Sequence, residues 1–188
     1  VSTLLFAIVS FALLSCNSND DTAEDNGLEG SGITITDDVD CCSAEEALQV
    51  YKFLQTVKII PEMSVVVDGK YNVFAYSKTG KFQVGYNDIY FVATKRSSGN
   101  YVKNFSVTGI LPLMNMAAMN KHHSTPVGAT VESFDNRYLA VKRGWISFLM
   151  PTGDSNTWSV SYDVQVLGTQ SRVEGAEAEV SSLADGQE

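Results

Sequence analysis

The stretch Thr157–Val166, TWSVSYDVQV, decides the fold class of this chain. Aromatic or β-branched side chains occupy every second position, and polar side chains occupy the positions between them. Because successive side chains of a β-strand point to opposite faces, this alternation predicts a strand with one buried face and one face in water. The buried set is Trp158, Val160, Tyr162, Val164 and Val166.

Segments upstream of this strand predict more strands. Residues 137–151, RYLAVKRGWISFLMP, contain the apolar run Trp145–Met150, which is typical of a strand covered on both faces. Earlier segments are rich in β-branched and aromatic residues, and Lys78–Lys81 and Ser97–Asn100 are glycine-containing hairpin signals. The earlier segments are YNVFAYS (71–77), KFQVGYN (81–87), IYFVATKR (89–96) and YVKNFSV (101–107).

This pattern predicts an all-β fold. About seven or eight short strands, separated by frequent turns, are typical of an immunoglobulin-like antiparallel β-sandwich. The three cysteines, at positions 16, 41 and 42, all precede the strand-rich region, so we expect aromatic and aliphatic packing to hold the core. At 188 residues, 44% of them hydrophobic, the chain suits one domain with flanking segments.

The formal net charge of -9 is unevenly distributed along the chain. Residues 16–51 hold ten acidic and no basic residues, and residues 173–188 hold five acidic and no basic residues. The remaining segment, 52–172, therefore carries seven acidic residues against all thirteen basic ones. Its lysines and arginines are mostly scattered singly, which indicates a solvated surface and no nucleic-acid partner.

Composition also predicts the domain boundaries. Residues 16–42 have few apolar side chains and predict an acidic flexible tether, and residues 172–188 predict an acidic disordered tail or a linker to a further domain. Between them, residues 43–171 form the expected module. It begins with a short helix over 43–55, because Ser43 and Glu46 fit a capping box and Leu48, Tyr51 and Leu54 follow at helical spacing.

The first residues predict a secretory signal and an envelope location. Residues 1–15 are apolar or small and too few to span a bilayer, as in a signal peptide. Leu13–Cys16 resembles a bacterial lipobox, which implies that Cys16 is lipidated and anchors the protein to a membrane. The acidic residues after Cys16 resemble the export signal of Bacteroidota surface lipoproteins, which implies an outer-membrane lipoprotein; an outward-facing and a periplasm-facing orientation both stay open. A plain signal peptide with an incidental cysteine is the alternative.

The adjacent Cys41 and Cys42 leave three alternatives open. Their Cα atoms are about 3.8 Å apart, below the usual disulfide span, so a bond between them would be strained. Free or intermolecular thiols, a vicinal disulfide and metal ligation all remain compatible with the sequence.

The segment Pro112–Pro126, PLMNMAAMNKHHSTP, concentrates candidate metal ligands. It contains three of the five methionines and both histidines of the chain, at Met114, Met116, Met119, His122 and His123. Thioether sulfur and imidazole without carboxylates suit copper, Cu(I) above all. The alternative is that Met114 and Met116 continue the apolar run Ile110–Leu113 into the core, as methionine often fills irregular gaps.

Three motifs in order resemble the YtkA-like domain of Bacteroidota lipoproteins. They are Gly85–Asn87 at a strand start, the methionine-rich segment ending in His123–Pro126, and the strand with Trp158. The resemblance covers about residues 65–168 and implies a β-sandwich in the cell envelope, with copper handling inferred from the Met and His residues.

Two functions follow as hypotheses. The first is an envelope lipoprotein that binds copper through its Met/His loop for buffering, sensing or delivery. The second is an adhesion or complex-assembly module that binds an envelope protein, with the methionines packed in its core. The sequence has no Gly-x-Ser-x-Gly, no His-Glu-x-x-His, no Cys-x-x-Cys and no phosphate-binding loop, so we expect no enzymatic activity.

Overall fold

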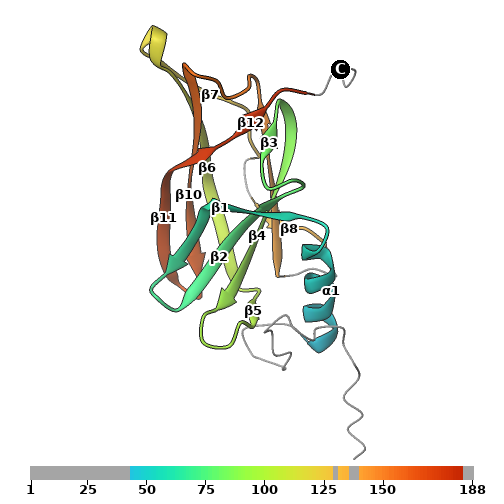
Figure 1. Cartoon of the computed structure of the whole chain (residues 1–188). Helices are drawn as coiled ribbons and strands as arrows, with labels where there is room; N and C mark the ends of the chain where they lie inside the picture. Colours follow the sequence, from blue (N-terminus) through green and yellow to red (C-terminus); the bar gives the residue numbers. More distant parts are fainter. Residues whose placement is uncertain (1–42, 129–130, 136–139, 184–188) are drawn as a thin grey trace, which may run out of the picture.

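Two antiparallel β-sheets pack face to face in the computed structural model, which describes residues 43–183 except 129–130 and 136–139 (Figure 1). The predicted all-β sandwich with a short N-terminal helix is confirmed. The large sheet has the order β1 (Lys58–Val67), β2 (Tyr71–Ser77), β4 (Gly85–Lys95), β9 (Val141–Phe148), β8 (Glu132–Ser133), and β5 (Tyr101–Val102) pairs with β4. The second sheet has the order β11 (Thr169–Ala178), β10 (Asn156–Val166), β6 (Phe105–Met116), β7 (Lys121–Ser124). A short pair, β3 (Phe82–Gln83) with β12 (Val180–Ser181), is parallel.

The core lies between the two sheets, and β10 faces it as predicted. All five side chains of the alternating apolar set on β10 are buried. The Trp158 ring packs edge-on against Phe148 of the opposite sheet, with 5.0 Å between ring centroids. Tyr162 contacts Phe91 of β4 at 5.1 Å, and its hydroxyl donates a hydrogen bond to the Met63 carbonyl of β1. These contacts between aromatic side chains join the two sheets.

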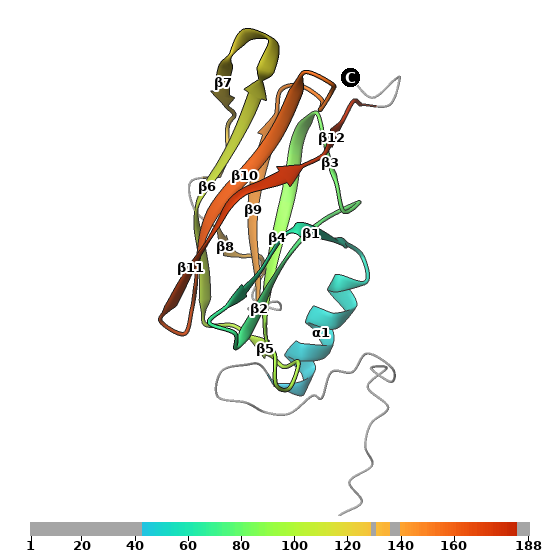
Figure 2. The ribbon, with the colours of Figure 1, turned by 60° about the vertical axis from the view of Figure 1, so that its left-hand side comes forward.

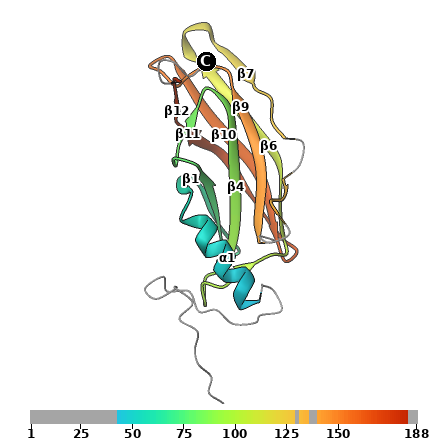
Figure 3. The ribbon, with the colours of Figure 1, turned by 90° about the vertical axis from the view of Figure 1, so that its right-hand side faces the viewer.

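Helix α1 (Ala44–Leu54) covers one part of the outer face of the large sheet (Figures 1 and 3). The predicted capping box is present, because the Glu46 backbone N–H donates to Ser43 Oγ and the Ser43 N–H donates to the Glu46 carboxylate. The packed face differs by one position from the expected one: Ala47 and Val50 are the buried residues. Val92 and Val141 of the sheet lie under the helix and pack against Ala47 and Val50.

Two expectations about the strands are wrong. Residues 172–178, predicted as part of a disordered tail, belong to β11, and Val180–Ser181 form β12. Val173, Ala176, Ala178 and Val180 are buried, so small apolar side chains between the acids supply a packed face. The run at 145–150 is not covered on both faces either: β9 ends at Phe148, and Leu149 is 63% exposed.

Within the part of the chain that the structure describes, no helix is long and apolar enough to cross a membrane. The predicted signal peptide 1–15, the lipidation residue Cys16, the tether 16–42 and the pair Cys41 and Cys42 lie outside the described residues.

Candidate functional site

The methionines and histidines singled out in the sequence lie on the hairpin formed by β6 and β7 (Figure 2). The hairpin tip is a single 3-10 turn, η1 (Ala117–Met119), followed by Asn120 in the left-handed conformation with φ of 49°. The register places Met114 opposite His123, Asn115 opposite His122, and Met116 opposite Lys121. The turn at the tip fixes this register, and the register decides which candidate ligands lie on the same face.

The hairpin divides the five candidate ligands between its two faces. Residues directly opposite in an antiparallel pair project to the same face, and residues two apart on one strand share a face. Met114, Met116 and His123 therefore lie on the face that continues the sandwich core, and His122 projects to the other face with Asn115. Met119 lies apart from both sets, at the tip, and is 52% exposed.

Met114 and Met116 are also the residues with packing roles. Met114 is 2% exposed, belongs to the core, and pairs across strands with Trp158 of β10. Met116 is half-buried against the same core, and His123 is exposed on the edge strand. The prediction that Met114 continues the apolar run into the core is confirmed. Its sulfur lies on the same face as an exposed imidazole, one strand away.

The ligand chemistry of this hairpin is dominated by sulfur. In the ranges that the structure describes, no group of three or more His, Cys, Asp or Glu side chains could hold a metal ion. A site on this hairpin has to combine thioether sulfur with one imidazole, since the two histidines face opposite ways. Two thioethers and one imidazole form a soft ligand set that suits Cu(I).

The other residues of the sequence motifs stabilise a turn before β4 and the connection that follows β7. Gly85 has a φ of +93°, a region that favours glycine, and the Asn87 amide donates to the carbonyls of Gln83 and Gly85 at 2.7 and 2.8 Å. The buried hydroxyl of Thr125 donates to the Ser147 carbonyl, where the chain crosses from β7 toward β9. Gly85–Asn87 therefore stabilise the turn at the start of β4, and Thr125–Pro126 hold the segment after β7 against β9.

The outer face of the large sheet carries an exposed aromatic pair that the sequence did not predict. Tyr86 on β4 is 54% exposed and stacks on Trp145 of β9. Both belong to segments in which apolar residues occur on both faces, and this pattern is also that of a strand buried on both sides. The signal that could have identified them is the polar Asp88 placed between Tyr86 and Tyr90 at the same period-2 spacing.

No family model, curated protein or solved structure matches this chain. The resemblance to the YtkA-like domain stays a prediction. The class that the described residues define is an antiparallel β-sandwich, and its function has to be inferred from the geometry of its own side chains.

Proposed function

We propose that the protein is a cell-envelope lipoprotein whose β6–β7 hairpin binds a soft metal ion through Met114, Met116 and His123. Copper as Cu(I) is the preferred ion, and buffering, sensing or delivery is the role. The observation that carries the proposal is the cross-strand pair of Met114 and His123, with Met116 two residues along on the same face. His122 and Met119, which the sequence also suggested, are outside this smaller set.

The cross-strand geometry supports a shared ion. Cβ atoms of directly opposite residues lie about 4.5–5.5 Å apart, so a thioether and an imidazole can reach one ion between them. Methionine has three rotatable side-chain bonds, which lets a half-buried Met116 add a second sulfur. Sulfur and imidazole without carboxylate favour Cu(I) over Mg²⁺ or Ca²⁺, which take oxygen ligands.

Exposure of the imidazole supports exchange of the ion. His123 is on the edge strand and open to solvent, whereas Met114 is enclosed by the core. An ion held by three protein ligands at such an edge remains open to an incoming ligand from one side. This arrangement suits buffering or delivery better than permanent storage.

The test is a Cu(I) titration of the full chain without oxygen, in competition with a colorimetric Cu(I) chelator. We expect His123→Ala, Met114→Leu and Met116→Leu each to weaken Cu(I) binding more than about tenfold, the effect of losing about 1.4 kcal/mol. Leucine keeps the volume of methionine, so the core is preserved. His122→Ala and Met119→Leu are the matched controls and should bind Cu(I) like the original chain. No binding, or an equal loss in His122→Ala, contradicts the proposed site.

The envelope address has a separate test. The apolar run before Cys16 and the polar residues after it support lipidation at that residue. We expect Cys16→Ser to release the protein from the membrane fraction, and unchanged membrane association contradicts the lipid anchor. For the orientation, protease treatment of intact cells should remove a module that faces outward and spare one that faces inward.

A second candidate function is adhesion or complex assembly with an envelope protein. It is favoured by exposed apolar side chains near one end of the sandwich, with Met119 at 52%, Leu149 at 63% and Met150 at 38% exposure. Both the hairpin tip and the β9–β10 connection lie at this end (Figure 3). A partner that binds there should be lost from in-cell cross-links on Leu149→Asp and retained on His123→Ala.

A further inference from the structure

The outer face of the large sheet is only partly covered by helix α1. Side chains that project outward from β4 and β9 alternate along each strand, and the register places Asp88 opposite Trp145 and Tyr90 opposite Arg143. Helix α1 packs over the part around Val92 and reaches Tyr90, whose ring contacts Phe53 at 5.0 Å. Beyond Tyr90 the outward side chains of both strands lie outside the cluster that packs under the helix.

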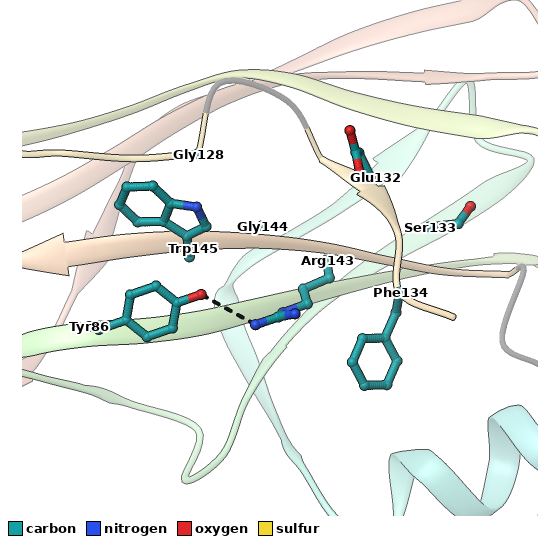
Figure 4. Close-up of a pocket in the computed structure, with 8 residues that line it drawn as sticks. All are labelled: Tyr86, Gly128, Glu132, Ser133, Phe134, Arg143, Gly144 and Trp145. Carbon is teal, nitrogen blue, oxygen red and sulfur yellow. Dashed lines mark hydrogen bonds between the residues drawn. The ribbon is translucent and has the colours of Figure 1, made fainter. Parts of the chain in front are cut away.

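A hollow of about 480 Å³ lies over this uncovered part. Figure 4 shows the rings of Tyr86 and Trp145 next to each other, with Arg143 and then Phe134 further along. The two rings are 5.6 Å apart between centroids, with 27° between their planes. The lining residues are Tyr86, Gly128, Glu132, Ser133, Phe134, Arg143, Gly144 and Trp145.

Hydrogen bonds fix the exposed tyrosine in place. The Tyr86 hydroxyl donates to Asp88 at 3.1 Å and accepts from an Arg143 terminal nitrogen at 3.3 Å. Arg143 Nε also donates to Asp88 at 2.8 Å, and this hydrogen bond is the main cause that raises the pKa of Arg143. A ring that is 54% exposed and already held in one orientation loses little entropy when a ligand binds.

The charges in the hollow do not favour an anionic ligand. Asp88 and Arg143 form an ion pair, so the positive charge of the guanidinium is largely balanced. Glu132 adds a negative charge to the lining, directly across from Arg143 in the pairing of β8 with β9. Phosphate-bearing polymers bind through surplus Lys and Arg, and no such surplus lines this hollow.

We propose that this hollow binds a neutral saccharide chain. A sugar ring has a face of C–H groups, positively polarised and suited to the negative face of an aromatic ring, and a rim of hydroxyl groups. Tyr86 and Trp145 supply the rings, and Glu132, Ser133 and Arg143 supply the polar donors and acceptors for hydroxyl groups. Aromatic walls with a few fixed polar groups are the usual composition of a small-ligand site.

The polar residues of the lining favour a saccharide over a proline-rich peptide, which also stacks on exposed aromatic rings. A proline-rich peptide docks in grooves lined by aromatic side chains and presents mainly apolar rings. Here Glu132, Ser133 and Arg143 account for three of the eight lining residues, and Asp88 is hydrogen-bonded to the Tyr86 hydroxyl. The hydroxyl groups of a saccharide can form additional hydrogen bonds with these polar groups, whereas a proline ring offers them none.

The test is native gel electrophoresis of the full chain through gels that contain a soluble neutral polysaccharide. The probes are a β-glucan, a xylan, a mannan and an α-glucan, followed by calorimetry with oligosaccharides of the retarding polymer. We expect at least one polymer to retard the protein, and Tyr86→Ala and Trp145→Ala each to reduce the association constant more than tenfold. Tyr86→Phe keeps the ring and should lose less than Tyr86→Ala.

Matched controls separate this site from folding and from the hairpin. Leu149→Ala removes an exposed apolar side chain directly after β9 but outside the hollow, and should bind like the original chain. His123→Ala should keep saccharide binding, and Trp145→Ala should keep Cu(I) binding and the melting temperature within a few degrees. The proposal is overturned if none of the four polymers retards the protein, if retardation survives both aromatic substitutions, or if only a proline-rich peptide binds.

Discussion

Replacing Tyr162 with Phe tests the tie between the two sheets. The ring of Tyr162 is buried in the core, and its hydroxyl donates to the carbonyl of Met63. Met63 lies in the stretch of β1 between Ile60 and Val65 where the register with β2 shifts, so Met63 has no paired residue on β2. The hydroxyl of Tyr162 supplies a donor to this carbonyl from the other sheet.

The expected cost follows from this geometry. Phenylalanine keeps the ring contact with Phe91 but leaves a buried carbonyl without its donor, which costs about 1–3 kcal/mol. For a domain of this size about 2 kcal/mol lowers the melting temperature by roughly 4–8 °C. Urea unfolding followed by tryptophan fluorescence measures the change. A loss below about 0.5 kcal/mol refutes the reasoning, because exposed or already paired carbonyls give such values.

The same residue predicts a dependence of stability on alkaline pH. Burial raises the pKa of Tyr162 above its ordinary value of 10, so the folded protein keeps this proton where the unfolded chain has released it. The contribution of Tyr162 to the free energy of unfolding is therefore fully present below about pH 10 and is lost as the pH rises above that value. Tyr162→Phe should show a shallower alkaline decline, with the remainder due to groups such as Tyr76, whose pKa burial also raises. An unchanged slope contradicts this assignment.

Further predictions concern the hairpin, the turn, the helix and the C-terminal strand. Met114→Ala should cost about 2–5 kcal/mol in denaturant unfolding and Met114→Leu less than about 1.5 kcal/mol, because only alanine leaves a cavity; equal costs contradict a core position. Asn87→Ala should cost about 1–3 kcal/mol by removing hydrogen bonds in the Gln83–Gly85 turn, and an unchanged midpoint argues against that role. Ser43→Ala removes the cap of helix α1 and should lower the free energy of unfolding by about 0.5–2 kcal/mol. Denaturant unfolding and the far-ultraviolet helix signal measure this loss. Deleting residues 172–188 should destabilise the sandwich by several kcal/mol, since it removes most of β11; a soluble, equally stable truncation refutes the strand assignment.

The strand content was predictable because β10 and the helix start carry local signals. The alternation around Trp158 and Tyr162 matches the period of a strand, and Ser43 with Glu46 matches a cap. β11 was not predictable in the same way. Its pairing with β10 shifts between Val160 and Tyr162, and Gly175 has a φ of 60°, so the buried Val173 and Ala176 are three residues apart instead of two.

The site was less predictable than the fold, because a strand register decides it. His122 and His123 are adjacent, and a shift of one residue in the hairpin exchanges their faces. The 3-10 turn and the left-handed Asn120 at the tip fix that register, and neither follows from the methionine and histidine spacing. The aromatic hollow depends on where helix α1 ends over the sheet, and this position depends on tertiary packing.

The mode of attachment of helix α1 has a mechanical consequence. The helix packs on the large sheet through side chains such as Val50, whereas the strands are joined by ladders of backbone hydrogen bonds. Helix α1, which Ser43 caps, lies toward the end of the molecule opposite the tip of the β6–β7 hairpin (Figures 1 and 2). A pull applied at Ser43 loads the helix before any strand, so we expect it to peel away first at low force. Detachment of the helix then lengthens the chain under tension while the sandwich stays folded.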